Sequence, residues 1–243
     1  PLGGLPGYDA AIQALSGIMS VNGEAGGEPL RVGLPVVDMV TGLNAALGIM
    51  FALNERQRSG QGQFVEAALY DCGLSLLHPH AANHLMDGRI PRRTGNAHPN
   101  ITPYDTFATG SEPIFLAVGN DRQFATLCKL IGAGELPGDE RFVDNGQRCT
   151  HRDELKALLE AKLAAHQCKP LADALVRTGV PCAPIQEVAA ALADQALTGP
   201  AIHRTRGQHT AGIAGSIDHH APVGCQTRRL IQTPFTHDPQ HAR

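Results

Sequence analysis

Apolar residues recur at three- and four-residue steps from 39 to 58, and this period predicts one long helix. Leu43 and Leu47 belong to the apolar series. Arginines near the end of the segment and Gly60 just beyond it are typical of a helix C-terminus. An apolar segment that reads as extended chain precedes the helix, so Asp38 is predicted to lie at the corner between the two.

Further elements follow from the same reasoning. We expect helices at 8–19, 70–86, 121–131 and 171–178, and extended segments at 62–69, 104–108, 114–118 and 180–185. Pro79 should kink its helix. Thr150 should cap another helix, which carries on one face Leu155, Leu158, Leu159 and Leu163. Strands that alternate with helices predict an α/β fold.

The pattern of residues along the chain predicts three parts: an α/β part at 1–88, a small α/β unit at 89–197, and an atypical segment at 198–243. The last part holds six of the twelve histidines and has no apolar repeat that predicts a helix or strand. The chain also begins without Met, so we expect it to be part of a longer protein.

Composition narrows the class of function. The 243 residues are 42% hydrophobic, which is enough for a sizeable core. A net charge of -3 argues against nucleic acid as a partner, and no uninterrupted apolar run is long enough to predict a membrane span. Six widely spaced cysteines indicate reduced thiols in a cytoplasmic protein rather than a disulfide framework or a zinc site.

Asp38 is the sharpest candidate for chemistry. A helix dipole favours a carboxylate at the N-terminus of the helix. An ionised carboxylate there can attack a thioester carbonyl and form a mixed anhydride. The alternative is that Asp38 serves only as the N-cap of the helix.

Two further groups are candidates for binding. Tyr8 and Asp9 precede a helix and are placed to position an acyl group, or else they are a packed Tyr beside a capping Asp. The loop 92–99 contains Arg93, Asn96 and His98, which suit a carboxylate ligand, although such a loop is also typical of a solvated linker.

Several motifs are missing. The glycines near residue 23 do not have the spacing of a phosphate-binding loop, and no serine lies in a GxSxG elbow. The histidine pairs lack partners at metal-ligand intervals, so we expect no metal.

An ordered set of motifs resembles the family III CoA-transferases, also called CaiB/BaiF proteins. The set comprises Gly7-Tyr8-Asp9 with Gln13-Ala14 and Ser16-Gly17, Gly33-Leu34-Pro35-Val36-Val37-Asp38 with Gly42, Arg58-Ser59-Gly60-Gln61-Gly62-Gln63, Arg93-Thr94-Gly95-Asn96-Ala97-His98 with Thr102-Pro103-Tyr104, and Ala117-Val118-Gly119-Asn120-Asp121-Arg122-Gln123-Phe124. Together the motifs cover about residues 1 to 195, after which the family pattern stops.

The resemblance implies that Asp38 is the catalytic nucleophile, passing through an aspartyl-acyl anhydride and an aspartyl-CoA thioester. It also implies part of a Rossmann-like large domain, a small α/β domain and an interlocked homodimer. The substrates would be an acyl-CoA and a small carboxylic acid, with the CoA thioester as substrate and no covalently bound cofactor.

The loop at 93–98 is similar to that of enzymes acting on small dicarboxylic acids, such as succinate–hydroxymethylglutarate CoA-transferases, which favours succinyl-CoA as donor. Two alternatives stay open. The chain is an inactive truncated fragment, or it is an acyl-CoA racemase, which Tyr8 disfavours because racemases of this family carry His-Asp where this chain has Tyr8-Asp9.

Overall fold

The computed structural model describes residues 7–193, 202–205 and 208–211, and contacts divide the chain into two units, 1–185 and 186–243. The helices are α1 (Asp9–Leu15), α2 (Ile18–Val21), α3 (Val36–Ser59), α4 (Leu69–Ser75), α5 (His80–Asp87), α6 (Asp121–Leu130), α7 (Asn145–Thr150), α8 (Arg152–Leu163), α9 (Cys168–Arg177) and α10 (Val188–Ala193), with a 3-10 turn η1 at Leu136–Gly138. The strands are β1 (Tyr104–Phe107), β2 (Ile114–Ala117), β3 (Cys182–Pro184), β4 (Ile202–Thr205) and β5 (Gln208–Ala211).

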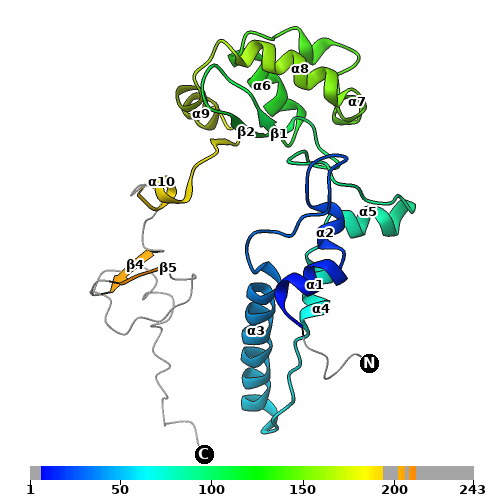
Figure 1. The fold of residues 1–243 in the computed structure, drawn as a ribbon, viewed down its shortest axis with the longest axis vertical. Coiled ribbons are helices and arrows are strands. Elements are labelled where there is room, and N and C mark those ends of the chain that lie inside the picture. The colour runs from blue at the N-terminus through cyan, green and yellow to red at the C-terminus, as the bar shows by residue number, and fades with distance from the viewer. Residues whose placement is uncertain (1–6, 194–201, 206–207, 212–243) are drawn as a thin grey trace, which may run out of the picture. The chain divides into compact units, whose positions relative to one another are not determined.

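The long helix predicted at 39–58 is confirmed as α3, which begins three residues earlier, at Val36. It ends at Gly60, which adopts φ 74° and donates its N–H to the Arg56 carbonyl. Glycine adopts a left-handed conformation with less strain than any other residue, so Gly60 determines where the helix stops. Helices α1 and α4 pack against α3 (Figure 1).

Two predictions next to α3 are wrong. The strand predicted at 62–69 does not form: residues 61–68 are irregular chain and Leu69 already begins α4. A strand needs a partner, and none of the described strands pairs with this segment. The helix predicted at 70–86 is two helices, α4 and α5, and Pro79 is the N-cap residue of α5. Proline has no N–H to donate to the preceding turn, so it begins a helix more readily than it continues one.

The three-stranded sheet has the order β1-β2-β3, with both ladders antiparallel. The register pairs Phe107 with Ile114 across the first ladder, and Ile114 with Pro184 across the second. Helix α8 packs against β1 and α9 against β3. Figure 1 shows α6, α8 and α9 gathered around this sheet. The buried core here includes Leu116, Phe124, Leu127, Phe142, Leu155, Leu159, Leu163 and Leu175.

The predictions for the helices of this part hold with two corrections. Thr150 does not cap α8: it ends α7, whose cap is Asp144, and α8 begins after His151 without a side-chain cap. Leu158 lies 37% exposed, outside the buried stripe of α8. The buried leucines of α8 follow one another at four-residue steps, and Leu158 lies to one side of that row.

In the second unit, α10 is followed by β4 and β5, which pair antiparallel with Ile202 opposite Ala211. The sequence predicted no regular element after 198, and this pair of strands corrects that expectation. The other residues of the segment 198–243 lie outside the described residues. The sheets confirm a mixed helix and strand fold, while the Rossmann-like large domain stays a prediction.

Helix α3 has an unusual surface. Among the described helices it is the one that is long and apolar enough to cross a membrane, with a mean hydropathy of 1.8. Only 6% of its apolar 18-residue stretch is buried. Counting uninterrupted apolar runs misses it because Thr41 and Asn44 interrupt the series. Core helices of soluble proteins can be equally long and apolar, so length and composition alone are only weak evidence that α3 spans a membrane.

Candidate active site

Asp38 lies in the first turn of α3, and its side chain is exposed. The residue before the helix is Pro35, which makes no side-chain cap. Asp38 is therefore inside the helix, and the alternative that it acts only as the N-cap is wrong. Its carboxylate makes no hydrogen bond or ion pair with another described residue.

The cap of α3 comes from Asp9, the first residue of α1. Asp9 is 9% exposed, and its Oδ1 accepts hydrogen bonds from the N–H groups of Val37 (2.8 Å) and Asp38 (3.2 Å). Its Oδ2 accepts from Nε2 of Gln13 at 2.6 Å. A carboxylate against the free N–H groups of a helix is favoured both by hydrogen bonding and by the helix dipole. Asp9 thus ties α1 to the backbone of Asp38.

Gln13 completes this arrangement. It was not among the site residues predicted from the sequence. Asp9 and Gln13 lie four residues apart, so both project from the same face of α1. Gln13 is fully buried and also bonds to the chain ahead of α3. Two polar residues four positions apart, with the apolar Ile12 between them, could have indicated a buried polar pair. The sequence does not tell which other element such a pair contacts.

Tyr8 takes up the N-cap position of α1 with extended backbone, and the residue is 83% exposed. The alternative of a packed Tyr is therefore wrong. Asp9 does not cap its own helix, because its oxygens face α3 and Gln13. Both Asp9 oxygens already accept hydrogen bonds from the protein. The substrate-binding roles of Tyr8 and Asp9 stay predictions.

The loop 92–99 contacts the turn around Gly23 rather than Asp38. Arg93 donates from Nε to the Gly27 carbonyl (2.9 Å) and from Nη1 to the Ser20 carbonyl (3.2 Å). Gly23 has φ +131°, and a Cβ there would lie 2.8 Å from the Glu28 carbonyl oxygen. The turn needs glycine at this position to fold back under the Arg93 side chain.

Asn96 and His98 lie on the far side of this loop, toward β1. Asn96 is exposed and donates to Oγ1 of Thr106 at 3.0 Å. His98 stacks obliquely on Tyr104, with ring centroids 5.1 Å apart, and its Nδ1 accepts the Asn100 N–H at 3.1 Å. The His98 proton is therefore on Nε2. No hydrogen bond of Arg93, Asn96 or His98 reaches Asp38.

The surroundings of His98 favour its neutral imidazole. Partial burial lowers the pKa of His98 below its usual value, and the Arg152 guanidinium, His80 and His78 lower it further. A neutral ring with its proton on Nε2 can donate one hydrogen bond to a carboxylate but adds no positive charge. Of the three loop residues, only Arg93 carries a permanent charge, and its guanidinium already has two backbone partners.

Other chemical features of the described residues are few. No three His, Cys, Asp or Glu side chains there are grouped to hold a metal ion. The described cysteines are all free. An open groove of about 380 Å³ touches α2 and α5 and contains none of the predicted site residues; its lining includes Gly17, Val21, Leu77, His80, His84 and Ile90.

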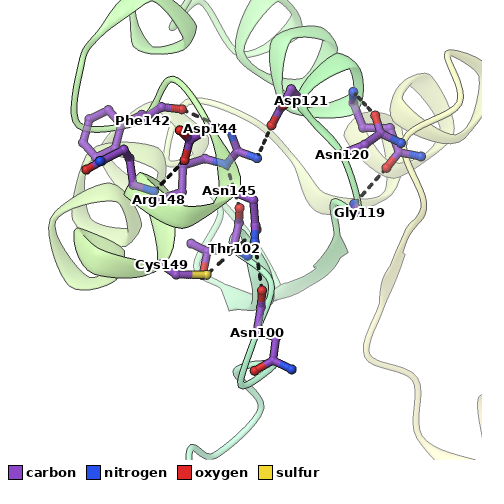
Figure 2. A network of polar contacts seen from close by, with 12 residues as sticks. Asn100, Thr102, Gly119, Asn120, Asp121, Phe142, Asp144, Asn145, Arg148 and Cys149 are labelled. Atoms are coloured by element: carbon purple, nitrogen blue, oxygen red, sulfur yellow. Dashed lines mark hydrogen bonds and ion pairs between the residues drawn. The ribbon is translucent and has the colours of Figure 1, made fainter. Parts of the chain in front are cut away.

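A second polar network, shown in Figure 2, organises the part of the chain around β1 and α6. Arg148 is 1% exposed and donates to the carbonyls of Thr102 (2.8 Å) and Phe142 (3.0 Å) and to Oδ1 of Asp121 (2.6 Å). Its guanidinium lies 4.6 Å from the centre of the Phe124 ring. The contacts are all internal, so this network is structural.

The motif 117–124 supplies the beginning of α6 in the same region. Asn120 caps the helix by accepting the Gln123 N–H at 2.9 Å, and Gln123 returns the contact by accepting the Gly119 N–H at 2.8 Å. The Gln123 Nε2 also donates to the Gly179 carbonyl at 3.0 Å. In the described structure this motif therefore forms a capped turn and holds the end of α9 in place.

Comparison with known proteins gives consistent results. The profile of CoA-transferase family III matches residues 1–217. A succinate–glutarate CoA-transferase of Agrobacterium fabrum is 38% identical over 194 residues, 80% of this chain and 48% of that protein. An acetyl-CoA:oxalate CoA-transferase of Acetobacter aceti is 38% identical over 192 residues, 79% of this chain and 49% of that protein.

The fold is also found in solved structures. The crystal structure of a CaiB/BaiF family protein from Brucella suis matches with a TM-score of 0.71 and 38% identity, over 90% of this chain and 58% of that one. The chain spans about half the length of the curated relatives it matches.

Proposed function

Because the chain belongs to CoA-transferase family III, we propose that it supplies the nucleophile of a CoA-transferase, and that this nucleophile is the Asp38 carboxylate. The observation that carries the proposal is the division of labour at the start of α3. Asp9 satisfies the backbone N–H groups of Val37 and Asp38, so the exposed Asp38 carboxylate is left available to attack a substrate.

The proposed reaction has two halves. In the first, an Asp38 oxygen attacks the thioester carbonyl of the donor acyl-CoA, and the CoA thiolate leaves to give an aspartyl-acyl anhydride. The thiolate then attacks the aspartyl carbonyl, the donor carboxylate leaves, and an aspartyl-CoA thioester remains.

In the second half, the acceptor carboxylate attacks the thioester and displaces the thiolate, giving a second anhydride. The thiolate attacks the acceptor carbonyl of this anhydride, which releases the new acyl-CoA and returns Asp38 to its starting form. Every bond broken is replaced by one formed, so the cycle consumes no oxidant and no water.

For the substrates we propose succinyl-CoA as donor and a small dicarboxylic acid as acceptor. The Agrobacterium relative is named for succinate and glutarate, and the Acetobacter relative for acetyl-CoA and oxalate. Succinate, glutarate and oxalate each carry two carboxylates, which supports a dicarboxylic acid as acceptor. Arg93, Asn96 and His98 are the proposed contacts for the second carboxylate.

We further propose that the protein works as a homodimer in the cytoplasm, in which parts of the family fold outside this chain complete the CoA site. The largely exposed apolar surface of α3 supports an additional protein surface packed against it.

The test is to trap the acyl group. The protein is incubated with succinyl-CoA and hydroxylamine, which converts an aspartyl anhydride or thioester to a hydroxamate, and the modified peptide is mapped by mass spectrometry. We expect modification at Asp38 that is lost in Asp38→Asn. Asp71→Asn is the matched control, because Asp71 is also an exposed acid in the first turn of a helix.

Absence of the Asp38 hydroxamate, both in this chain and in the full reading frame that contains it, with all acyl-CoA donors tried, would falsify the proposal. A racemase is distinguished in the same experiment by incubating a 2-methylacyl-CoA in D₂O, since a racemase exchanges the α-proton. We expect no exchange.

A further inference from the structure

Gln13 is a buried amide whose hydrogen-bonding groups are directed at the start of α3. Its side chain is 0% exposed. Its Nε2 donates to Oδ2 of Asp9 (2.6 Å) and to the Leu34 carbonyl (3.2 Å). Its Oε1 accepts the Val32 N–H at 2.8 Å. With a donor and an acceptor matched at opposite ends, the amide has one orientation.

These contacts constrain the chain on both sides of the corner. The bonds to Val32 and Leu34 hold the segment that leads into α3. The bond to Asp9 orients the carboxylate whose other oxygen accepts the N–H groups of Val37 and Asp38. The approach to the helix and its first turn are therefore both fixed through one side chain.

We propose that Gln13 is the positioning residue of the Asp38 nucleophile, acting through Asp9 and through the segment 32–34. This inference rests on the proposed function of Asp38. The role requires an amide, because the side chain has to donate to Asp9 and accept from Val32 at the same time. A carboxylate cannot donate, and an apolar side chain can do neither.

The informative substitution is Gln13→Glu, which keeps the shape but places a second carboxylate against Oδ2 of Asp9. Two ionised carboxylates at that distance repel, so in buffer alkaline enough to ionise both, where the rates are compared, Asp9 should turn away from α3. Displacing a nucleophile by as little as about 1 Å can slow attack about 100-fold. We therefore expect the rate of Asp38 hydroxamate formation at saturating succinyl-CoA to fall about 10- to 100-fold. The succinyl-CoA concentration that gives half the maximal rate should stay the same.

Two matched variants separate positioning from general damage. Ser16→Ala removes a buried hydroxyl from the same helical region that has no hydrogen-bond partner among the described residues, and it should leave the rate unchanged. The double variant Asp9→Asn with Gln13→Glu returns one amide and one carboxylate to the pair, and it should recover at least part of the lost rate.

Amide hydrogen exchange gives a second readout that does not depend on catalysis. Gln13→Glu should speed exchange at Val37 and Asp38, while the β1–β2 ladder that pairs Phe107 with Ile114 keeps its protection and shows that the protein is folded. Faster exchange with a slower rate, and recovery of both in the double variant, supports the positioning role.

The failures can be told apart. A wild-type protein that is never acylated at Asp38 refutes the proposed function, and the positioning role falls with it. A wild type that is acylated, beside a Gln13→Glu variant with an unchanged rate, refutes only the role of Gln13. A slower rate with unchanged exchange at Val37 and Asp38 also refutes it, because the first turn of α3, on which both routes act, is then unchanged.

Discussion

At the start of α3, two neighbouring carboxylates have different surroundings. Asp9 is buried and held by N–H groups of Val37, Asp38 and Gln13, whereas Asp38 is exposed and leaves its oxygens to solvent. A carboxylate surrounded by protein donors is a poor nucleophile, because its lone pairs are engaged. The structure therefore separates the capping group from the group that we propose to react.

Arg148 carries a prediction about stability. Arg148→Ala leaves the Thr102 and Phe142 carbonyls without their buried donor and removes a guanidinium packed on Phe124. Each unpaired buried carbonyl costs about 1–3 kcal/mol, so we expect the free energy of unfolding to fall by roughly 3 kcal/mol or more. Urea denaturation measures the change.

Arg122→Ala is the control for this prediction. Arg122 lies near Asp121 in sequence but is exposed, so its removal should change the free energy of unfolding by no more than about 0.5 kcal/mol. Equal effects of the two substitutions would show that the buried network does not stabilise the protein as its contacts indicate.

The sequence selected Asp38 as the candidate nucleophile, which stays a prediction, but it misassigned the cap of the helix. Asp38 follows an apolar segment and precedes a periodic one, which is visible locally. The partner of its N–H group is Asp9, almost thirty residues earlier, and no local pattern indicates which helix an acidic side chain will meet. The roles of Gln13 and Arg148 were not predicted for the same reason, because residues to which they hydrogen-bond lie far away in sequence.

At the scale of elements, α3 contains two glycines in different surroundings. A Cβ at Gly42 would meet no atom within 4 Å, whereas a Cβ at Gly48 would lie 2.8 Å from Cγ1 of Val65. Alanine in place of a helical glycine stabilises a helix by about 1 kcal/mol when there is room. We expect Gly42→Ala to raise the free energy of unfolding by up to that amount.

Gly48→Ala should not show this gain, because Val65 is stiff at χ1 and the segment 61–68 would have to move away from the helix. Urea denaturation compares the two variants directly, and adding Val65→Ala to Gly48→Ala should restore the stabilisation. If the two single variants are equally stable, the segment does not pack closely on α3 as described.

Element prediction succeeded where the chain itself fixes the element. The period of α3 extends over six turns and ends at a left-handed glycine, so local information suffices. The strand expected at 62–69 failed because the alternation of apolar and polar residues does not supply a partner strand. The small sheet was found because β1 and β2 are joined by a short turn and pair with each other.

At the scale of the whole molecule, α3 presents an apolar surface. The large hydrophobic side chains that are more than a third exposed there are Met39, Leu43, Leu47, Ile49, Met50, Phe51 and Leu53. Contiguous apolar surface of this kind binds hydrophobic dyes and promotes association. We expect the isolated chain to bind ANS and to self-associate at micromolar concentration in light scattering.

Replacing Leu43 and Met50 together by Lys should reduce both signals, whereas Asn54→Lys, on the same helix at an exposed polar position, should leave them unchanged. A wild-type chain that is monomeric and does not bind the dye would contradict the exposed surface that the structure shows.

The third strand of the sheet has a consequence for how the protein is made. β1 and β2 pair across a short turn, but β3 arrives only at Cys182–Pro184, after α6, α7, α8 and α9. Pairing partners so far apart in sequence slow folding, because a long loop has to close first. During synthesis one edge of β2 stays unpaired until the ribosome has released residue 184. Over that interval the nascent chain exposes an apolar strand edge, which is the period in which a chaperone would protect it.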